Sequence, residues 1–221
     1  GAFTSCQVVL RVNQCYQMSY MTAASVGLWR DQQSGNLLDE IEGLFENLSS
    51  VRKGQFGREG RAPSIVGILN ITPDSFSDGG LFLDDIKAYD QTNLMINSGA
   101  TIIDIGGEST RPGSKAIKEH LEWSRISKIL KLLSKKIPLS LDTRKSNVME
   151  RGIKLGVRLI NDVSGLNYDN ETINVLKKYK IPFVIQHSQG FPEYMQKKPS
   201  YKNELLDIYD FFEEKIKFLR S

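Results

Sequence analysis

The chain of 221 residues has little cysteine and no long hydrophobic run. Its two cysteines, Cys6 and Cys15, both lie near the N-terminus and cannot form the disulfide framework of a small secreted domain, so a reducing compartment is expected. The longest early uncharged stretch, residues 12–29, contains several amide and hydroxyl side chains and is too polar to span a membrane. No basic-then-apolar secretory signal is visible, so we expect a cytoplasmic protein with no membrane partner.

Neither sign of charge dominates, because 29 Lys and Arg residues stand against 26 Asp and Glu residues, for a net charge of +3. No dense basic stripe stands out, and we therefore expect no nucleic-acid partner. The first 30 residues contain no acidic residue, which loosely resembles a mitochondrial transit peptide and leaves a mitochondrial location open as the alternative. The shares of hydrophobic residues (40%) and charged residues (25%) are typical of a globular protein.

The composition changes near residue 62 and predicts two regions, residues 1–62 and 63–221. In the first region, one short helix is clear at residues 37–48, where apolar residues recur at helical spacing. We expect the rest of this N-terminal extension to be largely irregular, with a glycine-rich and charged linker at residues 53–61. The helix leaves open the hypothesis that residues 1–62 are an interaction module.

From residue 63 onward, short apolar runs alternate with longer amphipathic stretches. The apolar runs predict parallel strands covered on both faces, at residues 64–71, 101–105, 138–141, 158–160 and 182–185. The amphipathic stretches predict helices at residues 85–98, 120–135, 146–155, 170–179 and 202–219. The helix at residues 146–155 is expected to start with Ser146 as its cap and to end at Gly156. The helical spacing predicts that Ile86, Tyr89 and Leu94 in the first of these helices face a core. In the second, the same spacing predicts core positions for Leu121, Ile126, Ile129, Leu130 and Leu133. The predicted fold class is therefore α/β, with five βα units.

Five alternating units fit either an open doubly wound sheet or part of a (β/α)8 TIM barrel. The G-x-G-x-x-G turn that would favour a Rossmann fold is absent. Instead, polar residues stand near the end of every predicted strand, where both architectures place their ligand sites: Asn70, Asp104, Asp142, Asn161, Asp162 and His187. Convergence of five polar strand ends favours a partial barrel made of the first five βα units.

Each candidate site residue also has a purely structural interpretation. Composition alone favours an Asx- and Ser-rich turn over a substrate-covering loop at residues 70–80. Gly106 and Gly107 would let the backbone approach a ligand, and Arg111 offers a planar fork for an anion, but a surface arginine on a capped loop fits as well. Asp142 could cap the helix at residues 146–155, and a single histidine at a strand end, such as His187, is more often structural than catalytic.

Together these motifs resemble bacterial dihydropteroate synthase, a transferase family of folate biosynthesis. Residues 70–80 match the family's first signature nearly letter for letter, and residues 99–113 match the second. Three further motifs follow in the same order and spacing: Asp142-Thr143, Ile160-Asn161-Asp162, and His187-x-Gln189-Gly190-x-Pro192 with Met195-Gln196. The corrinoid-linked methyltetrahydrofolate methyltransferases share the pterin-binding barrel but would not be expected to carry the loop at residues 72–80. The resemblance covers residues 63 to about 219.

The resemblance implies an enzyme that joins para-aminobenzoate to hydroxymethyl-dihydropterin diphosphate and releases diphosphate, with Mg²⁺ as cofactor and small molecules as partners. It implies that Asn70 is a metal ligand and that Asp142 and Asn161 are catalytic and bind the pterin. The other implied substrate-binding residues are Thr72, Pro73, Phe76, Thr110, Arg111, His187 and Gln189. Neither His187 nor Gln189 is expected to transfer a proton.

Three family elements do not follow residue 219: an Asp-Pro-Gly stretch, a strand carrying Ser-Arg-Lys, and one ending in Arg-x-His. Since the first residue is Gly1 rather than Met and a complete barrel needs about 250 residues, we expect an incomplete copy. The lost residues would bind the pterin and the diphosphate, and losing one anion-stabilising donor costs about 100- to 1000-fold in turnover. An inactive truncated remnant, or a pterin-binding fragment without catalysis, is therefore the alternative. We also expect unpaired edges at the first and fifth strands.

Overall fold

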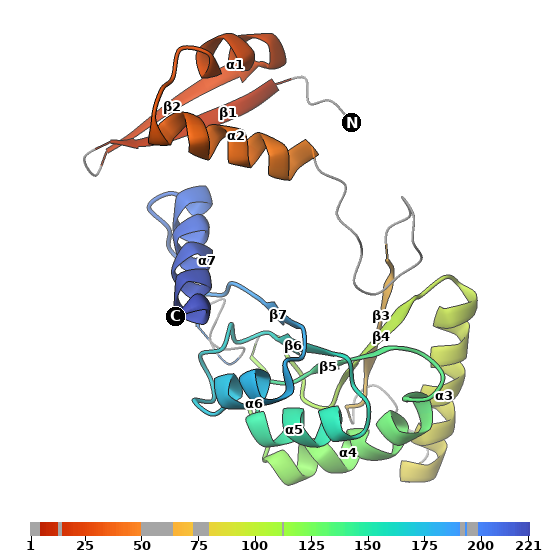
Figure 1. The fold of residues 1–221 in the computed structure, drawn as a ribbon. Coiled ribbons are helices and arrows are strands. Elements are labelled where there is room, and N and C mark those ends of the chain that lie inside the picture. Colours follow the sequence, from red (N-terminus) through yellow and green to blue (C-terminus); the bar gives the residue numbers. More distant parts are fainter. Residues whose placement is uncertain are drawn as a thin grey trace. The chain divides into compact units, whose positions relative to one another are not determined.

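The computed structural model describes residues 5–12, 15–49, 64–72, 80–111, 113–190, 193 and 199–221 (Figure 1). The chain divides into two compact units, Gly1–Lys53 and Gly54–Ser221, and each is considered separately below. The predicted boundary at residue 62 and the predicted linker at residues 53–61 lie outside the described residues. Within the described ranges, no helix has the length and apolar character needed to cross a lipid bilayer.

The first unit contains a two-stranded antiparallel sheet and two helices (Figure 1). The elements are β1 (Ser5–Val12), β2 (Cys15–Thr22), α1 (Ala23–Arg30) and α2 (Asn36–Ser49). The strands pair along their whole length, from Ser5 opposite Thr22 to Val12 opposite Cys15. Helix α2 confirms the helix predicted at residues 37–48.

The expectation that the rest of this extension is largely irregular was wrong. A strand signal is present, because Tyr16, Met18 and Tyr20 alternate with polar residues over β2. The hairpin was missed because residues 13 and 14 include no glycine and so provide no strong turn signal. Helix α1 begins with a capping box, in which Thr22 and Ser25 each accept a hydrogen bond from the other's backbone N–H.

The second unit contains the five predicted βα units in chain order. Its strands are β3 (Val66–Asn70), β4 (Ile102–Gly106), β5 (Leu139–Asp142), β6 (Leu159–Asp162) and β7 (Phe183–Ile185). Its helices are α3 (Gly80–Asn97), α4 (Glu119–Leu133), α5 (Ser146–Lys154), α6 (Thr172–Tyr179) and α7 (Glu204–Arg220). All ten predictions are confirmed as elements; the largest difference is that α3 begins at Gly80.

The sheet topology distinguishes between the two architectures that the sequence left open. In the second unit, neighbouring strands are parallel, and the strands follow one another across the sheet in the order of the chain, β3-β4-β5-β6-β7. A doubly wound sheet would reverse this order at a switch point and place helices on both faces. Here α3 to α6 lie along one face (Figure 1). The unit is therefore a partial (β/α) barrel, with β3 and β7 as the predicted unpaired edges.

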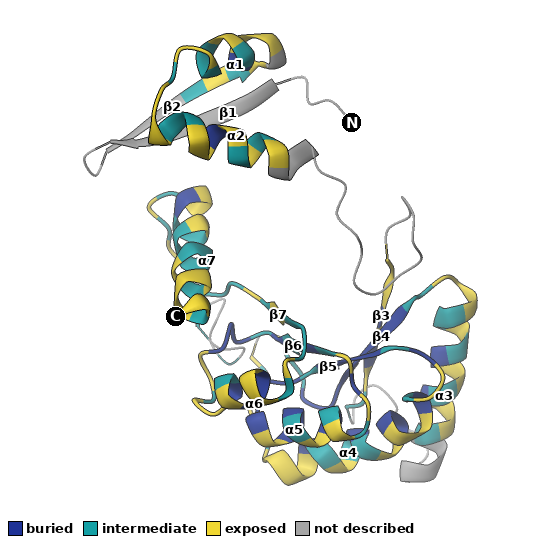
Figure 2. Cartoon of the chain, in the orientation of Figure 1, coloured by how far each residue is buried: buried dark blue, intermediate teal, exposed yellow. Residues whose placement is uncertain are grey.

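The hydrophobic core lies between the sheet and these helices, where Figure 2 shows the buried residues gathered. In β3 to β6, the apolar side chains that point to the helices are fully buried: Leu69, Ile103, Ile105, Leu139, Leu141 and Ile160. Helix α4 contributes the predicted core residues Ile126, Ile129, Leu130 and Leu133. Each such side chain contributes about 1.5–3 kcal/mol through its burial.

Two expectations about burial were wrong. The expectation that every strand is covered on both faces fails at the edges of the sheet. Strand β4 is buried along its whole length, whereas Ile68 of β3 and Val184 of β7 are exposed on the side away from the helices. Helix α3 is rotated relative to the prediction, with Ile86 and Leu94 exposed and Ala88 and Thr92 buried. Met95 and Ile96 pack against the core beside Ala88. The buried Thr92 hydroxyl is satisfied by donating to the Ala88 carbonyl.

Leu121, near the start of α4, is exposed as well, whereas the predicted core residue Tyr89 is partly buried against the core. The amphipathic period identified both helices correctly. The period alone did not predict correctly which side of each helix packs against the sheet. That side is set by contacts with the sheet and not by the helix sequence alone.

Candidate functional site

Four residues form a row across the sheet at the carboxyl ends of the strands. Asn70 lies opposite Gly106, Gly106 opposite Asp142, and Asp142 opposite Asn161. Because residues next to them on each strand point to the helices, these four face the helix-free side. A side-chain carbon at Gly106 would lie 3.3 Å from Asn70 Oδ1 and 3.4 Å from Asp142 Oδ2, so these two side chains converge over the glycine. We call these four residues the strand-end row.

Asp104 supports this row from the middle of β4, where it is almost fully buried. Its Oδ2 accepts a hydrogen bond from Asn161 Nδ2 at 3.0 Å, which orients the Asn161 amide. The sequence placed Asp104 among the strand-end polar residues but not among the site residues. The sequence does contain a signal for Asp104, because it is a charged residue inside the apolar run of β4. Burying an unpaired charge is costly, so a carboxylate at such a position indicates a role in the site.

The carboxyl groups of Asp104 and Asp142 both have raised pKa values. Burial raises the pKa of Asp142 to about 8, and the negative charge of Asp104 and other nearby carboxylates adds to the shift. Burial also raises the pKa of Asp104, against the hydrogen bonds from Ser140 and Asn161. Buried oxygens of both side chains, Oδ1 in each case, have no hydrogen-bond partner among the described residues. The row therefore presents unsatisfied carboxyl oxygens beside an oriented amide, which suits a flat ligand with N–H donors.

The alternative role of Asp142 as a helix cap is contradicted by the structure. The backbone N–H of Ser146, at the start of α5, donates to Asp169 Oδ2 at 2.8 Å. Ser146 is the first helical residue rather than the predicted cap, and Lys145 occupies the cap position. The predicted end of α5 is confirmed, because Gly156 follows with a φ of +101°.

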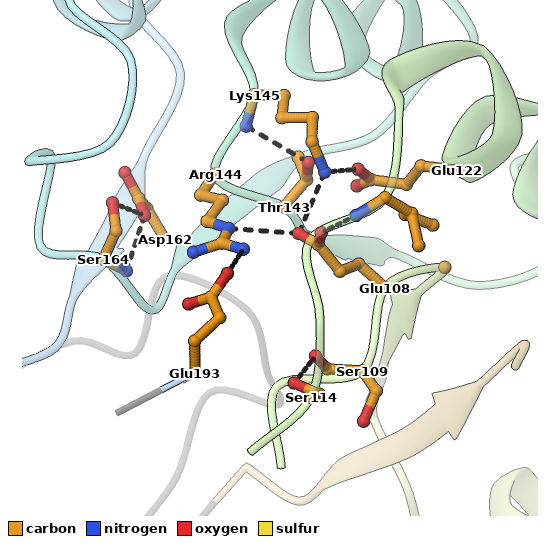
Figure 3. A network of polar contacts seen from close by, with 12 residues as sticks. Glu108, Ser109, Ser114, Glu122, Thr143, Arg144, Lys145, Asp162, Ser164 and Glu193 are labelled. Atoms are coloured by element: carbon orange, nitrogen blue, oxygen red, sulfur yellow. Dashed lines mark hydrogen bonds and ion pairs between the residues drawn. The ribbon is translucent and has the colours of Figure 1, made fainter. Parts of the chain in front are cut away.

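The loop after β4 carries Thr110 and Arg111. Its turn is held by hydrogen bonds from the Ser114 backbone N–H to the Arg111 carbonyl and from the Ser114 hydroxyl to the Ser109 carbonyl (Figure 3). Arg111 is exposed, and no contact of the described residues joins it to the strand-end row. Its position at the loop tip leaves its guanidinium available to an anion.

The loop after β7 holds its two predicted residues in structural contacts. The His187 ring packs edge-on against Phe211 of α7, with 4.8 Å between ring centroids. Gln189 makes two hydrogen bonds with the backbone of Ser200, with its Nε2 donating at 2.7 Å and its Oε1 accepting at 2.8 Å. These contacts join neither residue to the strand-end row. Thr72 follows β3 and is partly buried, whereas Pro73 and Phe76 lie outside the described residues.

The fold and this site define a class of protein: a barrel-type chain of parallel βα units that binds its ligand with polar side chains at the carboxyl ends of the strands. Residues 66–221 match the family model described as "Pterin binding enzyme". The chain belongs to this family.

Named relatives are consistent with membership of this family. The dihydropteroate synthase of Clostridium beijerinckii is 43% identical over 164 residues, which are 73% of this chain and 58% of that protein. The solved dihydropteroate synthase of Clostridium difficile, in the presence of pteroic acid, has a TM-score of 0.65 at 40% identity and covers 71% of this chain and 58% of its own. The Xanthomonas albilineans enzyme with 4-aminobenzoic acid has a TM-score of 0.65 at 33% identity, with 72% and 56% covered. The chain thus spans little more than half the length of these relatives.

Proposed function

We propose that this chain acts as a dihydropteroate synthase, which condenses para-aminobenzoate with hydroxymethyl-dihydropterin diphosphate to give dihydropteroate and diphosphate. The observation that carries the proposal is the strand-end row, where Asp142 and Asn161 lie side by side over the buried carboxyl of Asp104. The solved relatives with pteroic acid and with 4-aminobenzoic acid support the two substrate classes.

Pterin recognition follows from the chemistry of these side chains. A pterin ring carries N–H donors and acceptors along one edge, which match the Asp142 carboxyl and the Asn161 amide. The buried Oδ1 of Asp142 would gain a partner on binding. A hydrogen bond to a charged group contributes about 1.5–3 kcal/mol, so the Asp142 bonds would account for a large share of the affinity.

The same carboxyl group suits the bond changes of the proposed reaction. The carbon–oxygen bond to the diphosphate breaks, the pterin methylene carries the developing positive charge, and the arylamine nitrogen forms the new carbon–nitrogen bond and then loses a proton. An ionised Asp142 would stabilise positive charge on the ring. Since burial holds the pKa of Asp142 near 8, a cationic ring beside it would favour the ionised form.

The anionic part of the substrate requires positive charge or a cation. Asn70 ends β3 with its side chain exposed beside Asp142, and would supply one oxygen ligand to Mg²⁺. Among the residues that the structure describes, no three His, Cys, Asp or Glu side chains cluster as in an all-protein metal site. A Mg²⁺ ion held mainly by phosphate and water needs no such cluster, and when bound it would neutralise the leaving diphosphate. We assign Thr110 and Arg111 to the same anionic end.

The proposal is tested by titrating the full chain with pteroic acid, in parallel for the wild type, Asp142→Asn and a matched control, Asp90→Asn. Asp90 is an exposed residue of α3, far along the chain from the strand-end row. We expect Asp142→Asn to weaken binding about 10- to 100-fold, as expected for one charged hydrogen bond, and Asp90→Asn to bind like the wild type.

A second measurement, diphosphate release from the pterin diphosphate and para-aminobenzoate with Mg²⁺, separates synthesis from binding. Binding with turnover supports the full proposal. Binding without turnover supports the alternative of a pterin-binding chain without catalysis. Failure of the wild type to bind pteroic acid, or equal binding by Asp142→Asn, would overturn the assigned site.

A further inference from the structure

A buried ionic network joins the loops that follow β4 and β5 (Figure 3). Glu108, only 5% exposed, accepts hydrogen bonds on its Oε2 from Arg144 Nε at 3.1 Å and from Lys145 Nζ at 2.9 Å. Lys145 Nζ also donates to Glu122 Oε2 of α4 at 2.5 Å. Burial alone would raise the pKa of Glu108, but the hydrogen bonds from Lys145 and Arg144 lower it, so this carboxylate stays ionised.

Arg144 contacts the loops that follow three other strands. Besides its bond to Glu108 after β4, its Nη2 donates to Glu193 Oε1 after β7 at 3.2 Å. Its guanidinium carbon lies 4.1 Å from the ring centroid of Tyr168, after β6. Arg144 itself follows β5 and is only 3% exposed. One planar guanidinium thus serves two carboxylates and an aromatic ring at once, which a lysine ammonium does not reproduce.

The two carboxylates that Arg144 joins belong to the loops that carry predicted substrate-binding residues. Glu108 stands just before Thr110 and Arg111, and its Oε1 accepts from the Ile117 backbone N–H at 2.8 Å, so it closes this loop at both ends. Glu193 belongs to the loop that carries Gln189. The sequence separations are 36 residues from Glu108 to Arg144 and 49 from Arg144 to Glu193, so no local element holds these loops together.

We propose that Arg144 is a positioning residue that couples the loops after β4 and β7 and holds them in the arrangement that binds 4-aminobenzoate. It acts through Glu108 and Glu193, which belong to these two loops, and not through the four residues of the strand-end row. The inference rests on the proposed function, because Thr110 and Arg111 are assigned to the aminobenzoate and diphosphate end. Arg144 should therefore matter for 4-aminobenzoate and little for the pterin.

The test compares the full-length wild type with Arg144→Met, Arg144→Lys and the matched control Arg151→Met. Arg151 is an exposed residue of α5 whose guanidinium stacks 4.2 Å from the Trp123 ring and touches neither loop. Hydrogen exchange is followed in peptides that contain Arg111 and in peptides that contain Gln189 and Glu193. Affinities are measured for 6-hydroxymethylpterin, and for 4-aminobenzoate in the presence of that pterin and diphosphate.

In Arg144→Met we expect about tenfold faster exchange in both loops, because both lose their shared partner. We expect about tenfold weaker 4-aminobenzoate binding and pterin binding within about twofold of the wild type, since preorganised loops are lost but the strand-end row is not. Arg144→Lys should restore protection of one loop only, because an ammonium serves one carboxylate well. Arg151→Met should match the wild type.

Unchanged exchange in either loop, or equal losses of pterin and 4-aminobenzoate affinity, would overturn the positioning role in favour of a merely structural one. If Arg144→Met fails to fold, Glu193→Gln removes only the contact to the loop after β7 and tests the same coupling. A wild type that binds no pterin would reject the proposed function, while the exchange data would still decide whether Arg144 couples the loops.

Discussion

Asp142 ends β5 with its carboxyl group close to other acidic side chains, including Asp104 and Glu122. Burial, together with these charges, raises its pKa to about 8, whereas in the unfolded chain it takes the ordinary value near 3.8. The folded state therefore holds the proton more tightly than the unfolded state. The resulting contribution to stability is complete below the unfolded pKa and is lost as the pH rises toward the folded pKa.

We predict that the free energy of unfolding of the wild type falls between about pH 4 and pH 8, the unfolded and folded pKa values of Asp142, and that Asp142→Asn removes much of this fall. A shift of this size corresponds to about 6 kcal/mol at most, and we expect Asp142→Asn to exceed the wild type by about 1–3 kcal/mol at pH 9. Urea unfolding across this range measures it, with Asp90→Asn as control. Parallel curves for wild type and Asp142→Asn would contradict the assignment.

At the scale of elements, the connection from β4 to α4 depends on a close approach of backbone to helix. A side-chain carbon at Gly107 would lie 2.8 Å from Ile126 Cγ2 and 2.9 Å from the Glu122 carbonyl oxygen. Only glycine fits this contact without displacing the helix backbone. The same contact delivers Glu108, the next residue, to the ionic network.

Gly107→Ala should therefore destabilise the second unit by about 1–3 kcal/mol, the usual cost of overpacking a well-packed site. Gly43→Ala in α2 is the matched control, because nothing lies within 4 Å of a carbon added there. That control should be neutral or stabilising by up to about 1 kcal/mol, because alanine has the better helix propensity. Thermal unfolding of the three proteins tests this, and a Gly107→Ala variant as stable as the wild type would disprove the close contact.

At the scale of the second unit as a whole, the sheet is packed against helices on one face, and its edge strands are exposed on the other. Neighbouring residues of β3 show this contrast, because Ile68 is 67% exposed and Leu69 is 2% exposed. Val66 and Val184 add to the exposed apolar surface on this face. An apolar sheet face of this kind favours self-association.

A pair of substitutions in β3 tests the two faces. Ile68→Thr should change the free energy of unfolding by less than about 1 kcal/mol and reduce the binding of a hydrophobic fluorescent dye. Leu69→Thr should cost about 2–5 kcal/mol, the range for truncating a buried leucine. Denaturant unfolding and dye titration measure both effects. Equal destabilisation by the two substitutions would mean that the helix-free face is covered.

The sequence by itself determined the five βα units, the end of α5 at Gly156 and the polar residues at the strand ends. These features are local, because each depends on a few neighbouring residues. They are a hydrophobic period of two or 3.6 residues, a glycine at a helix end, and a short motif. The strand-end row followed as well, because parallel strands bring their carboxyl ends to one edge of the sheet.

Only the tertiary structure decided which residues meet across the chain. It placed all of α3 to α6 on one face, rotated α3 so that Thr92 is buried, and supplied Asp169 as the acceptor for the backbone N–H of Ser146, the first residue of α5. It raised the pKa of Asp142 by burial and joined Arg144 to two distant carboxylates. The physical reason is that burial, pKa and buried ion pairs depend on partners from other βα units, which no local pattern records.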